Sequence, residues 1–337
     1  MDIITQGLLG AAVAQSGSKQ SETKIATGIG FLAGMLADAD VLIHSAEDSL
    51  LTIEFHRHFT HALLFIPFGA LIAAMLLWPF LRKRIAFASL YFYCLLGYLL
   101  SGVLDAFTSY GTYLYWPLSN ERVSWHLISI IDPVFTFTLL FAILMGLKLK
   151  KTVAARAGLV LCGLYLAVCA WQLNRAETFV RQLAEQRGHT IERLVVKPTL
   201  GNNLLWRSTY INHDVIHVDA LRAGFNGIKH YPGSSVAKLA QTEINNTFAS
   251  DSVLYNDINR FNYFSDDYLA WYPGKPNVIG DMRYALLPDS IEPLWGIKFD
   301  TDQSLQHARF VTFRVNSKEN RQRFFDMLKG RDVPPLQ

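Results

Sequence analysis

Four long apolar runs in the first half of this 337-residue chain limit its fold more than any other feature. The hydrocarbon core of a bilayer is roughly 30 Å thick, and a helix needs about 20 mostly apolar residues to cross it. The four runs have about that length and cover residues 62–81, 85–104, 130–147 and 155–174. Two weaker runs precede them, at 3–15 and 25–43. We therefore predict about six membrane segments, of which the first two form a helical hairpin.

The second half of the chain has a different character. Mean hydropathy is +0.19 and 51% of the residues are hydrophobic, but these averages hide a change to mixed charge from Arg175 onward. We predict a transmembrane helical domain over 1–174 and a small soluble α+β domain over 175–337. Its expected helices are 175–186, which Gly188 ends, and 235–242, 251–265 and 317–328. Its expected strands are 191–197, 204–212, 215–221 and 308–315.

Net charge and cysteine content exclude two classes of protein. The net charge is only +3, and the basic residues form short clusters beside apolar runs, so no nucleic-acid partner is expected. Cys94, Cys162 and Cys169 all lie inside apolar runs, which excludes an extracytoplasmic disulfide framework and indicates packing residues. The first residues lack a basic segment, so we expect uncleaved membrane helices and no cleaved signal peptide.

Basic residues in short loops mark the cytoplasmic side of a membrane protein. Here they fall in alternate turns, at Lys19 and Lys24, at 82–84, and at 148–156. The intervening turns carry the histidines and most of the carboxylates of this half. This alternation predicts that the candidate ligands, both termini and the second domain lie on the extracytoplasmic side, with the bilayer lipid around the helices.

Metal-ligand chemistry is concentrated directly before the apolar run 62–80, in the segment Glu54-Phe55-His56-Arg57-His58-Phe59-Thr60-His61. Ionisable side chains at a bilayer edge are costly unless they are paired, ligated or hydrated. Imidazole and carboxylate together suit zinc, manganese or iron, and we favour zinc. His56 and His61 are candidate ligands, although spacing alone lets His58 replace His56. The alternative is a set of interfacial histidines bonded to headgroups or backbone.

Three carboxylates complete the candidate metal site. Side chains two apart on an α-helix diverge by roughly 200°, so Asp38 and Asp40 can face one ion only if their helix ends or unwinds there. Otherwise they are acids at a solvated helix end. Asp105 follows an apolar run and needs a cation, either a metal or an arginine such as Arg57 or Arg122. Helix capping is its structural alternative.

Two further residues are candidates for catalysis. Arg57 could stabilise an anionic intermediate, or it could hold the aspartates in place. Asp132 precedes Pro133, a pair typical of a helix N-terminus, and taken alone its structural reading is favoured. No Ser-His-Asp order, nucleotide-binding glycine loop or thiol nucleophile is apparent in the sequence, so a metal-activated water is the most economical mechanism.

These motifs together resemble a known family. The first half of the chain is similar to the bacterial membrane-bound metal-dependent hydrolases, also named LexA-binding, inner-membrane-associated hydrolases, and the second half is only loosely similar. The resemblance is carried by Met1-Asp2-Ile3-Ile4-Thr5-Gln6-Gly7-Leu8-Leu9-Gly10-Ala11-Ala12, Asp38-Ala39-Asp40, the segment 55–61, Leu104-Asp105-Ala106-Phe107-Thr108-Ser109-Tyr110-Gly111-Thr112, Trp116-Pro117 and Ile131-Asp132-Pro133.

The resemblance implies a site and a location. It implies a multi-pass bacterial inner-membrane protein whose site is built from Asp38, Asp40, His56, Arg57, His61 and Asp105, with Asp132 as a further member. The family's remote likeness to zinc phospholipases C implies phosphoester or lipid substrates. Two positions depart from the family pattern, because many relatives have histidine where this chain has Gln6 and Ser101. Losing two nitrogen ligands would imply a smaller site, a different metal occupancy or reduced activity.

The sequence therefore predicts an inner-membrane hydrolase with its site at the periplasmic interface. Asp38, Asp40, His56, His61 and Asp105 would bind one or two divalent ions, and Arg57 and Asp132 would act in catalysis. The substrate would be a phospholipid, another ester or a small molecule. The alternative is a non-catalytic membrane scaffold in which a structural metal or salt bridges fasten the helix ends. An ion transporter is less favoured, since its ionisable residues would lie at mid-membrane depth.

Overall fold

The chain folds into two compact units. The computed structural model describes residues 1–224, 226–315 and 317–336. The first, here called the helical unit, comprises Met1–Leu42, Phe55–Trp171 and Leu200–Asn202. The second, the sheet unit, comprises Ile43–Glu54, Gln172–Thr199 and Asn203–Gln337. The predicted domain boundary after Asn174 falls inside helix α8, Val153–Gln186, which begins in the helical unit and ends in the sheet unit.

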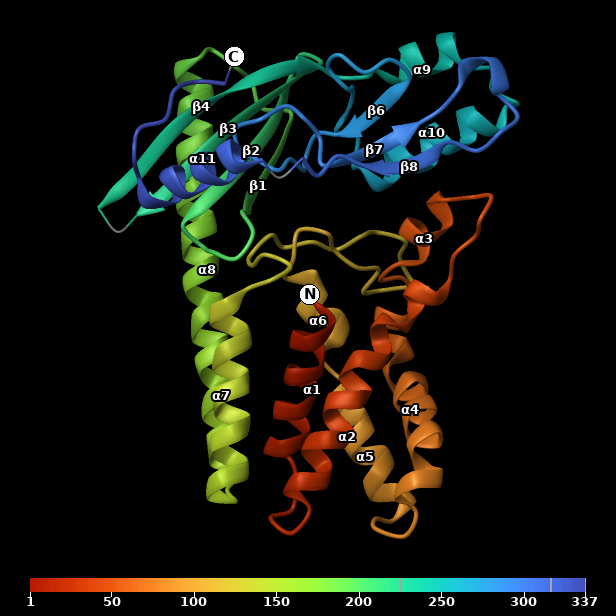
Figure 1. The fold of residues 1–337 in the computed structure, drawn as a ribbon, viewed down its shortest axis with the longest axis vertical. Coiled ribbons are helices and arrows are strands. Elements are labelled where there is room, and N and C mark those ends of the chain that lie inside the picture. Colours follow the sequence, from red (N-terminus) through yellow and green to blue (C-terminus); the bar gives the residue numbers. More distant parts are fainter. Residues whose placement is uncertain (225, 316, 337) are drawn as a thin grey trace. The chain divides into compact units, whose positions relative to one another are not determined.

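The helical unit is a bundle whose elements are drawn in red to yellow-green in Figure 1. The short helix α3 (Leu50–Phe55) belongs to the sheet unit up to Glu54. The elements of the helical unit are α1 (Ile3–Ser16), α2 (Thr23–Leu36), the 3-10 helices η1 (Ala37–Leu42), η2 (Phe59–His61) and η3 (Leu63–Phe65), α4 (Ile66–Leu81), α5 (Phe87–Tyr98), α6 (Ser101–Ala106) and α7 (Pro133–Leu149).

Four stretches of the described chain are long and apolar enough to cross a membrane. They are Thr23–Leu42, Leu63–Leu81, Phe87–Ala106 and Val153–Gln186. Two further apolar helices, α1 with 14 residues and α7 with 17, are shorter. The helical character of the first half is thus confirmed with up to four candidate spans, and a total of six remains a prediction.

Close packing of α1, α2 and α5 depends on glycine. A Cβ atom at Gly10 would lie 2.3 Å from the carbonyl oxygen of Gly30 and 2.6 Å from that of Gly97. Such small residues let helix backbones approach closely where apolar burial alone supplies little attraction between helices in lipid. The three helices therefore bring the C-terminal end of α2 and the short helix α6 to the same end of the unit (Figure 1).

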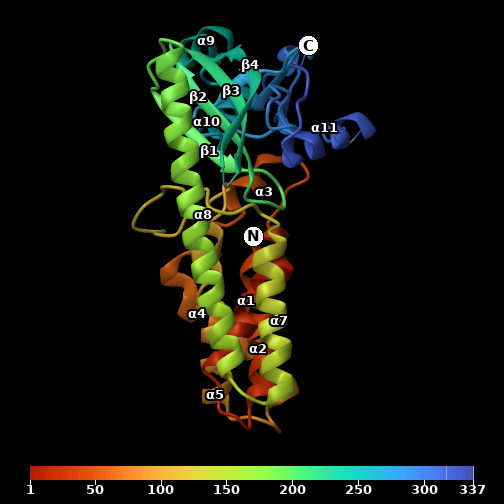
Figure 2. The same cartoon turned by 90° about the vertical axis from the view of Figure 1, so that its left-hand side faces the viewer.

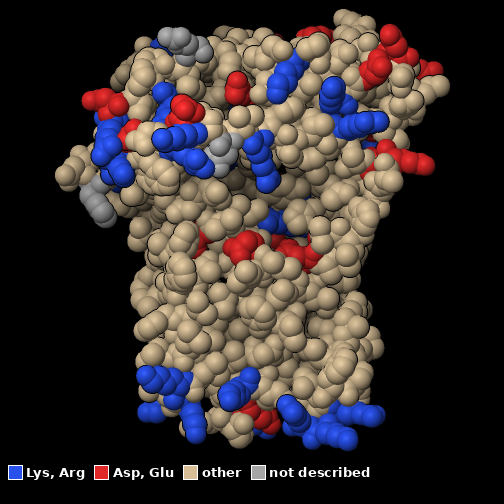
Figure 3. All heavy atoms as spheres, in the orientation of Figure 1, with Lys and Arg blue, Asp and Glu red and all other residues tan. Residues whose placement is uncertain are grey.

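Basic side chains lie at the opposite end of the helical unit. The α1–α2, α4–α5 and α7–α8 turns, which carry the basic clusters, are all at the lower end in Figure 1. Lysine and arginine side chains are gathered there in the space-filling view of Figure 3. The alternation of basic and acidic turns along the sequence therefore becomes a separation between two ends of one bundle.

Helix α8 differs from its prediction. The expected second helix at 175–186 is the C-terminal part of one continuous helix of 34 residues. A drop in hydropathy marks the end of an apolar run without ending a helix, because Arg175 and its neighbours retain helical propensity. The helix ends where expected, since Gly188 has a φ of +72°.

The sheet unit contains two four-stranded antiparallel sheets, each in sequential order. The first consists of β1 (Arg193–Pro198), β2 (Leu205–Asn212), β3 (Val215–Gly224) and β4 (Gly227–Ala237). The second consists of β5 (Leu269–Trp271), β6 (Val278–Asp281), β7 (Trp295–Lys298) and β8 (Arg309–Thr312). The helices around them are α9 (Gln241–Thr247), α10 (Val253–Phe264), η4 (Thr301–Gln303) and α11 (Lys318–Lys329).

One helix predicted in this unit is wrong. The expected helix at 235–242 begins inside β4, and α9 starts only at Gln241. Ser235 pairs with His217 and Val236 pairs with Ile216 across the β3–β4 ladder. Val236 also packs against the core cluster on that face of the sheet. Tertiary pairing therefore decides the conformation where local propensity is weak.

The first sheet is covered on both faces. On one face Ala176 and Val180 of α8 pack with Trp206 and Leu221, and Figure 2 shows this part of α8 lying along β1 and β2. On the other face Ile216 and its neighbours pack against Tyr268, Ala270 and Met282. This apolar packing fixes the C-terminal part of α8 against the first sheet.

Candidate metal centre

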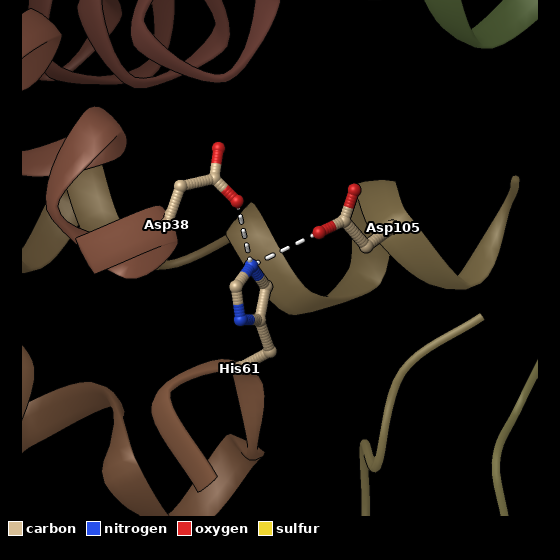
Figure 4. Close-up of side chains that lie close together, drawn as sticks. All are labelled: Asp38, His61 and Asp105. Atoms are coloured by element: carbon tan, nitrogen blue, oxygen red, sulfur yellow. Dashed lines mark ion pairs between the residues drawn. The ribbon is translucent and has the colours of Figure 1, made fainter. Parts of the chain in front are cut away.

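The predicted ligands meet at the end of the helical unit that lacks the basic turns. The chain leaves α2 as the 3-10 helix η1, which carries Asp38 and Asp40. The 3-10 helix η2 carries His61, and α6 carries Asp105. Figure 4 shows that the carboxylates of Asp38 and Asp105 both point toward the imidazole of His61. Three segments far apart in the sequence therefore contribute one side chain each.

Asp38, His61 and Asp105 have the geometry of a candidate metal site. Their ligand atoms all lie within 4.8 Å of one another. His61 Nε2 is 2.9 Å from Asp105 Oδ2 and 3.4 Å from Asp38 Oδ1. All three residues are buried. Two ligands held about 2.1 Å from a tetrahedral zinc ion lie roughly 3.4 Å apart, so these separations suit such an ion.

The three facing atoms also lack hydrogen bonds. Asp38 Oδ1, His61 Nε2 and Asp105 Oδ2 are buried, and none has a hydrogen-bond partner among the described residues. His61 Nε2 lies within ion-pair distance of both carboxylates, and Arg57 Nε is 3.1 Å from Asp105 Oδ2, so the buried carboxylates need positive charge from a protonated His61, from Arg57 or from a bound cation. A divalent ion bound by all three atoms would take the place of a proton on His61, so the residues present fit such an ion.

Asp40 has a different environment from Asp38. Its Oδ2 accepts hydrogen bonds from the Arg57 backbone N–H at 2.7 Å and the Thr60 hydroxyl at 2.9 Å. The same oxygen is 3.4 Å from His61 Nδ1, and Oδ1 is 3.1 Å from His56 Nδ1. The helix does unwind at this point, as the spacing requires. A 3-10 helix still turns by about 120° per residue, which separates the two carboxylates.

Asp40 and Thr60 therefore orient the His61 ring through its Nδ1 atom. The Thr60 hydroxyl is 3.0 Å from His61 Nδ1, on the ring edge opposite the candidate ion. Carboxylate and hydroxyl partners of this kind fix the tautomer and orientation of metal-binding histidines. His56 lies at the outer side of this arrangement, and its side chain is 29% exposed.

Arg57 is the buried cation of the site. Its Nε lies 3.1 Å from Asp105 Oδ2, and its side chain also donates to the Thr108 hydroxyl and the Met1 carbonyl. The Met1 amine contacts the other oxygen of Asp105. Arg57 has a φ of +60°, an uncommon backbone conformation for a residue other than glycine. Its carbonyl is held by Tyr113 N–H and the Thr112 hydroxyl, which keep this conformation in place.

The electrostatic balance of the site centres on His61. With no ion bound, burial disfavours its charged form, but the carboxylates of Asp105, Asp38 and Asp40 outweigh burial and raise the pKa of His61 to about 10. Three carboxylates around one imidazole create a strongly negative potential. Either a proton on His61 or a divalent cation beside it can neutralise that potential.

Gly102 allows α6 to approach His61. A Cβ atom at this position would lie 2.0 Å from the His61 carbonyl oxygen. Gly102 was not among the predicted site residues, and neither were Thr60 and Thr108, which hydrogen-bond to Asp40 and Arg57. Thr60 and Thr108 lie within the motifs quoted above, so their place beside the candidate ligands was the available signal.

The two positions that depart from the family pattern lie together. The Gln6 side chain donates a hydrogen bond to the Ser101 carbonyl at 3.2 Å. Gln6 Oε1 is buried and has no hydrogen-bond partner among the described residues. Ser101 is one helical turn before Asp105 on α6. Histidines at these two positions would therefore lie next to each other, close to the Asp105 turn.

Asp132 and His58 lie in other surroundings. Asp132 is the N-cap of α7, where its side chain accepts hydrogen bonds from the Phe135 N–H at 3.0 Å and the Tyr165 hydroxyl at 2.8 Å. These bonds give it a structural role, and its proposed catalytic role has no support from them. The His58 ring packs against Tyr113, with ring centroids 4.6 Å apart.

Comparison with known proteins identifies the family. A sequence profile of the YdjM inner membrane protein family matches residues 1–176, just over half of the chain. The chain belongs to the YdjM inner membrane protein family. The match spans all the candidate ligands and Arg57, and it ends before the strands of the sheet unit. The predicted inner-membrane character is thereby confirmed, and the family is described by its location without an activity.

One curated relative is similar over the same length. The chain is 28% identical over 176 residues to the uncharacterized protein YfhP of Bacillus subtilis (strain 168). The alignment covers 51% of this chain and 52% of that relative, so the chain spans about half the length of the curated relative it matches. No solved structure matches the chain. The likeness to YfhP adds no biochemical activity to the YdjM family description.

Proposed function

We propose that this YdjM family protein is a metal-dependent hydrolase of the bacterial inner membrane. Asp38, His61 and Asp105 would hold a divalent ion, with zinc favoured and manganese or iron as alternatives. The observation that supports this most strongly is the convergence of three buried ligand atoms, from three separate segments, within 4.8 Å of one another. Three protein ligands leave a fourth position of a tetrahedral ion for water, as in catalytic zinc sites.

The other residues would prepare the site for hydrolysis. A bound ion would supply a nucleophilic water near neutral pH, by lowering its pKa. Asp40 and Thr60 hold His61 in position through Nδ1. Arg57 is fixed beside Asp105, where its guanidinium can stabilise negative charge that develops on a substrate.

His56 and Asp40 determine whether the site holds one ion or two. Their facing atoms are 3.1 Å apart. This pair could bind a second ion, or Asp40 could serve only to orient His61 through Nδ1. Since Asp40 Oδ2 already accepts two hydrogen bonds, we propose one ion at Asp38, His61 and Asp105, with His56 at the exposed side of the site.

The arrangement of charge supports a periplasmic location. The basic turns lie at the other end of the helical unit from the candidate ligands (Figures 1 and 3). Because basic loops favour the cytoplasm, we infer that the site lies at the periplasmic interface and that the region after α8 is also periplasmic. A site at that depth suits a phospholipid, another ester or a small periplasmic molecule as substrate.

A salt-bridge scaffold is the second candidate function. Asp105 already has Arg57 at 3.1 Å and the Met1 amine in contact, and a protonated His61 would add a further positive charge. In that case the cluster would fasten α6, η1 and η2 without a metal. Buried ion networks of this kind are costly to break but contribute little net stability compared with apolar packing.

Metal analysis of purified variants tests the proposal. The full chain, purified in detergent, would be stripped with a chelator, incubated with zinc, dialysed and measured by mass spectrometry of the metal. We expect one bound zinc in the unmodified protein, loss of zinc in His61→Ala, and retention in His58→Ala, a histidine of the same segment. An unmodified protein that binds no zinc, manganese or iron would instead support the salt-bridge scaffold.

Activity provides the second test. Asp105→Asn keeps the size of the side chain and removes its charge. We expect this variant to lose metal-dependent hydrolysis of short-chain ester and phosphoester substrates in mixed micelles. Hydrolysis that is insensitive to chelator and unchanged in Asp105→Asn would show that the reaction takes place elsewhere.

A further inference from the structure

A polar cavity lies within the sheet unit where α8 ends. Its volume is about 170 Å³, space for several water molecules at roughly 30 Å³ each. It shares no residue with the metal centre. Residues of both β3 and β4 line it. The polar side chains that line it are Arg187, His189, His217, Asp219, Ser234 and Ser235.

The turn that follows α8 brings Arg187 and His189 to the cavity. The backbone N–H groups of Arg187 and His189 both donate to the Ala184 carbonyl, at 3.1 Å and 2.9 Å. Gly188 between them has a φ of +72°, which reverses the chain direction after the helix. Arg187 and His189 are therefore held on the same side of one tight turn.

A β-bulge shapes the opposite wall. The pairing register of β3 and β4 shifts between His217 and Asp219, so that Gly233 and Ser234 lie opposite one residue, Val218. A Cβ atom at Gly233 would lie 2.3 Å from the Val218 carbonyl oxygen. Only glycine fits this position without a backbone shift. Bulges of this kind redirect side chains and are frequent beside functional sites.

Asp219 is a buried anchor for the cations of the cavity. It is 1% exposed and receives two hydrogen bonds from Arg187, at 2.7 Å and 2.9 Å. His230 Nε2 lies 2.7 Å from the same carboxylate. The third hydrogen bond of Arg187 goes to the Tyr210 hydroxyl at 3.1 Å. A guanidinium carries five N–H donors, so Arg187 is fixed in place and retains donors for a ligand.

Two histidines face each other beside Arg187. The rings of His189 and His217 have centroids 4.4 Å apart, and His217 stacks on Tyr210 at 4.9 Å. His189 Nδ1 is 2.8 Å from the Tyr210 hydroxyl. Burial is the main cause that lowers the pKa of His217, and the nearby Arg187 acts in the same direction while Asp219 acts in the opposite one. Arg187 and the two imidazoles thus place several N–H groups at one side of the cavity, which suits an anionic ligand.

We propose that this cavity binds a phosphate-sized oxyanion, either free phosphate or the phosphate group of a phosphomonoester, through Arg187, His189, His217 and the serine hydroxyls. A phosphate accepts hydrogen bonds on several sides, which matches donors that come from α8, β3 and β4. A transition metal fits less well, because Asp219, the carboxylate of the cavity, is already paired with both Arg187 and His230. The proposal does not depend on the metal centre.

Binding should depend on pH through the two histidines. The charged and titratable groups that face them are Arg187 from the end of α8, Tyr210 from β2, Asp219 from β3 and His230 from β4. A bound anion favours the protonated imidazoles, so it should raise the pKa of His217. Conversely, affinity for phosphate should increase as the pH falls from 8 to about 6.5.

Calorimetry with inorganic phosphate tests the inference on the full chain in detergent micelles. We expect binding at pH 6.5 that weakens at pH 8, and a loss of about tenfold in affinity for His217→Asn, since hydrogen bonds to charged groups are worth about that factor. His213→Asn is the matched control, because His213 lies in the β2–β3 turn with an 83% exposed side chain. Phosphate binding that falls equally in both variants would overturn the proposal, and so would absent binding at pH 6.5 together with no response to the phosphomonoesters glycerol 3-phosphate and phosphatidate.

A second variant and a second readout protect the test against a folding defect. Ser234→Ala removes one hydroxyl donor and changes no charged group. We expect a several-fold loss of affinity for phosphate in this variant. In the unmodified protein with isotope-labelled histidine, phosphate should raise the pKa of His189 or His217 measured by NMR. Unchanged histidine pKa values at saturating phosphate would contradict the assignment.

Three ligands distinguish a soluble phosphate group from the headgroup of a lipid. Inorganic phosphate and glycerol 3-phosphate would be added to micelles, and phosphatidate would be supplied in nanodiscs with phosphatidylcholine nanodiscs as the control. Binding of either soluble ligand assigns a soluble phosphate group. A histidine pKa change only in phosphatidate nanodiscs assigns a lipid headgroup, and no change in any arm overturns the inference.

Discussion

Replacing Gly102 by alanine should weaken metal binding although Gly102 offers no ligand. The new Cβ would lie 2.0 Å from the His61 carbonyl oxygen and 3.3 Å from Leu114 Cδ1. Non-bonded carbon atoms need well over 3 Å from such neighbours, so α6 and η2 must separate by about 1 Å. The separation between Asp105 Oδ2 and His61 Nε2, which is 2.9 Å in this structure, would increase accordingly.

The expected loss of metal affinity follows from this displacement. Disturbing the partners that position metal ligands typically lowers affinity by about 10–100-fold, and a shift of the ligands themselves should be at the upper end of that range. Overpacking should also lower the free energy of unfolding by about 1–3 kcal/mol. The higher helix propensity of alanine offsets up to about 1 kcal/mol of that loss.

The assay is a zinc competition titration with a chromophoric chelator, together with thermal unfolding of the same samples. Gly163→Ala is the matched control, because Gly163 is in α8 and a Cβ atom there meets nothing within 4 Å. We expect the control to bind zinc like the unmodified protein. A Gly102→Ala variant with unchanged zinc affinity and unchanged stability would refute the packing argument.

Two further substitutions test structural roles. Asp132→Ala should lower the free energy of unfolding by about 0.5–2 kcal/mol through loss of the α7 cap while leaving zinc binding unchanged; loss of zinc, measured by metal analysis, would restore a role at the site. Lys197→Met should raise the free energy of unfolding by about 1–3 kcal/mol, because the buried amine has no hydrogen-bond partner among the described residues and lies over the Tyr284 ring. Burial lowers the pKa of Lys197 well below its ordinary value of 10.5, so the folded state disfavours a proton that the unfolded chain binds. The unmodified protein should therefore gain stability as the pH rises toward 10.5; denaturant unfolding should show this trend, and an equal trend in Lys197→Met would assign it to other groups.

The sequence predicted elements whose signals are local and regular. Apolar runs located α4, α5, α7 and α8, and alternating patterns located β3 and β8. The continuity of α8 through Arg175 was not predictable from hydropathy. A hydropathy change marks where the environment of a helix changes, and the helix itself can continue past that point. The strand at Ser235 was missed because its conformation depends on pairing with His217 across the β3–β4 hairpin, which the local residue pattern does not report.

The candidate site was predictable in residue type and less so in arrangement. Charged residues at a bilayer edge pointed to Asp38, His61 and Asp105 because such groups need partners. The different surroundings of Asp40 depend on the 3-10 geometry after Leu36, which spacing suggested only in outline. The cavity beside His217 had no sequence signal, since a turn, a hairpin and a bulge assemble it from separate segments.

X-ray absorption at the zinc edge tests the proposed metal centre on the purified, zinc-loaded chain. Coordination through Asp38, His61 and Asp105 predicts one imidazole and oxygen ligands at about 2.0–2.1 Å, with no sulfur. The same spectrum should be obtained for His58→Ala, and His61→Ala should hold no zinc to measure. A spectrum with sulfur ligands, a spectrum without an imidazole, or stoichiometric zinc in His61→Ala would contradict the assigned site.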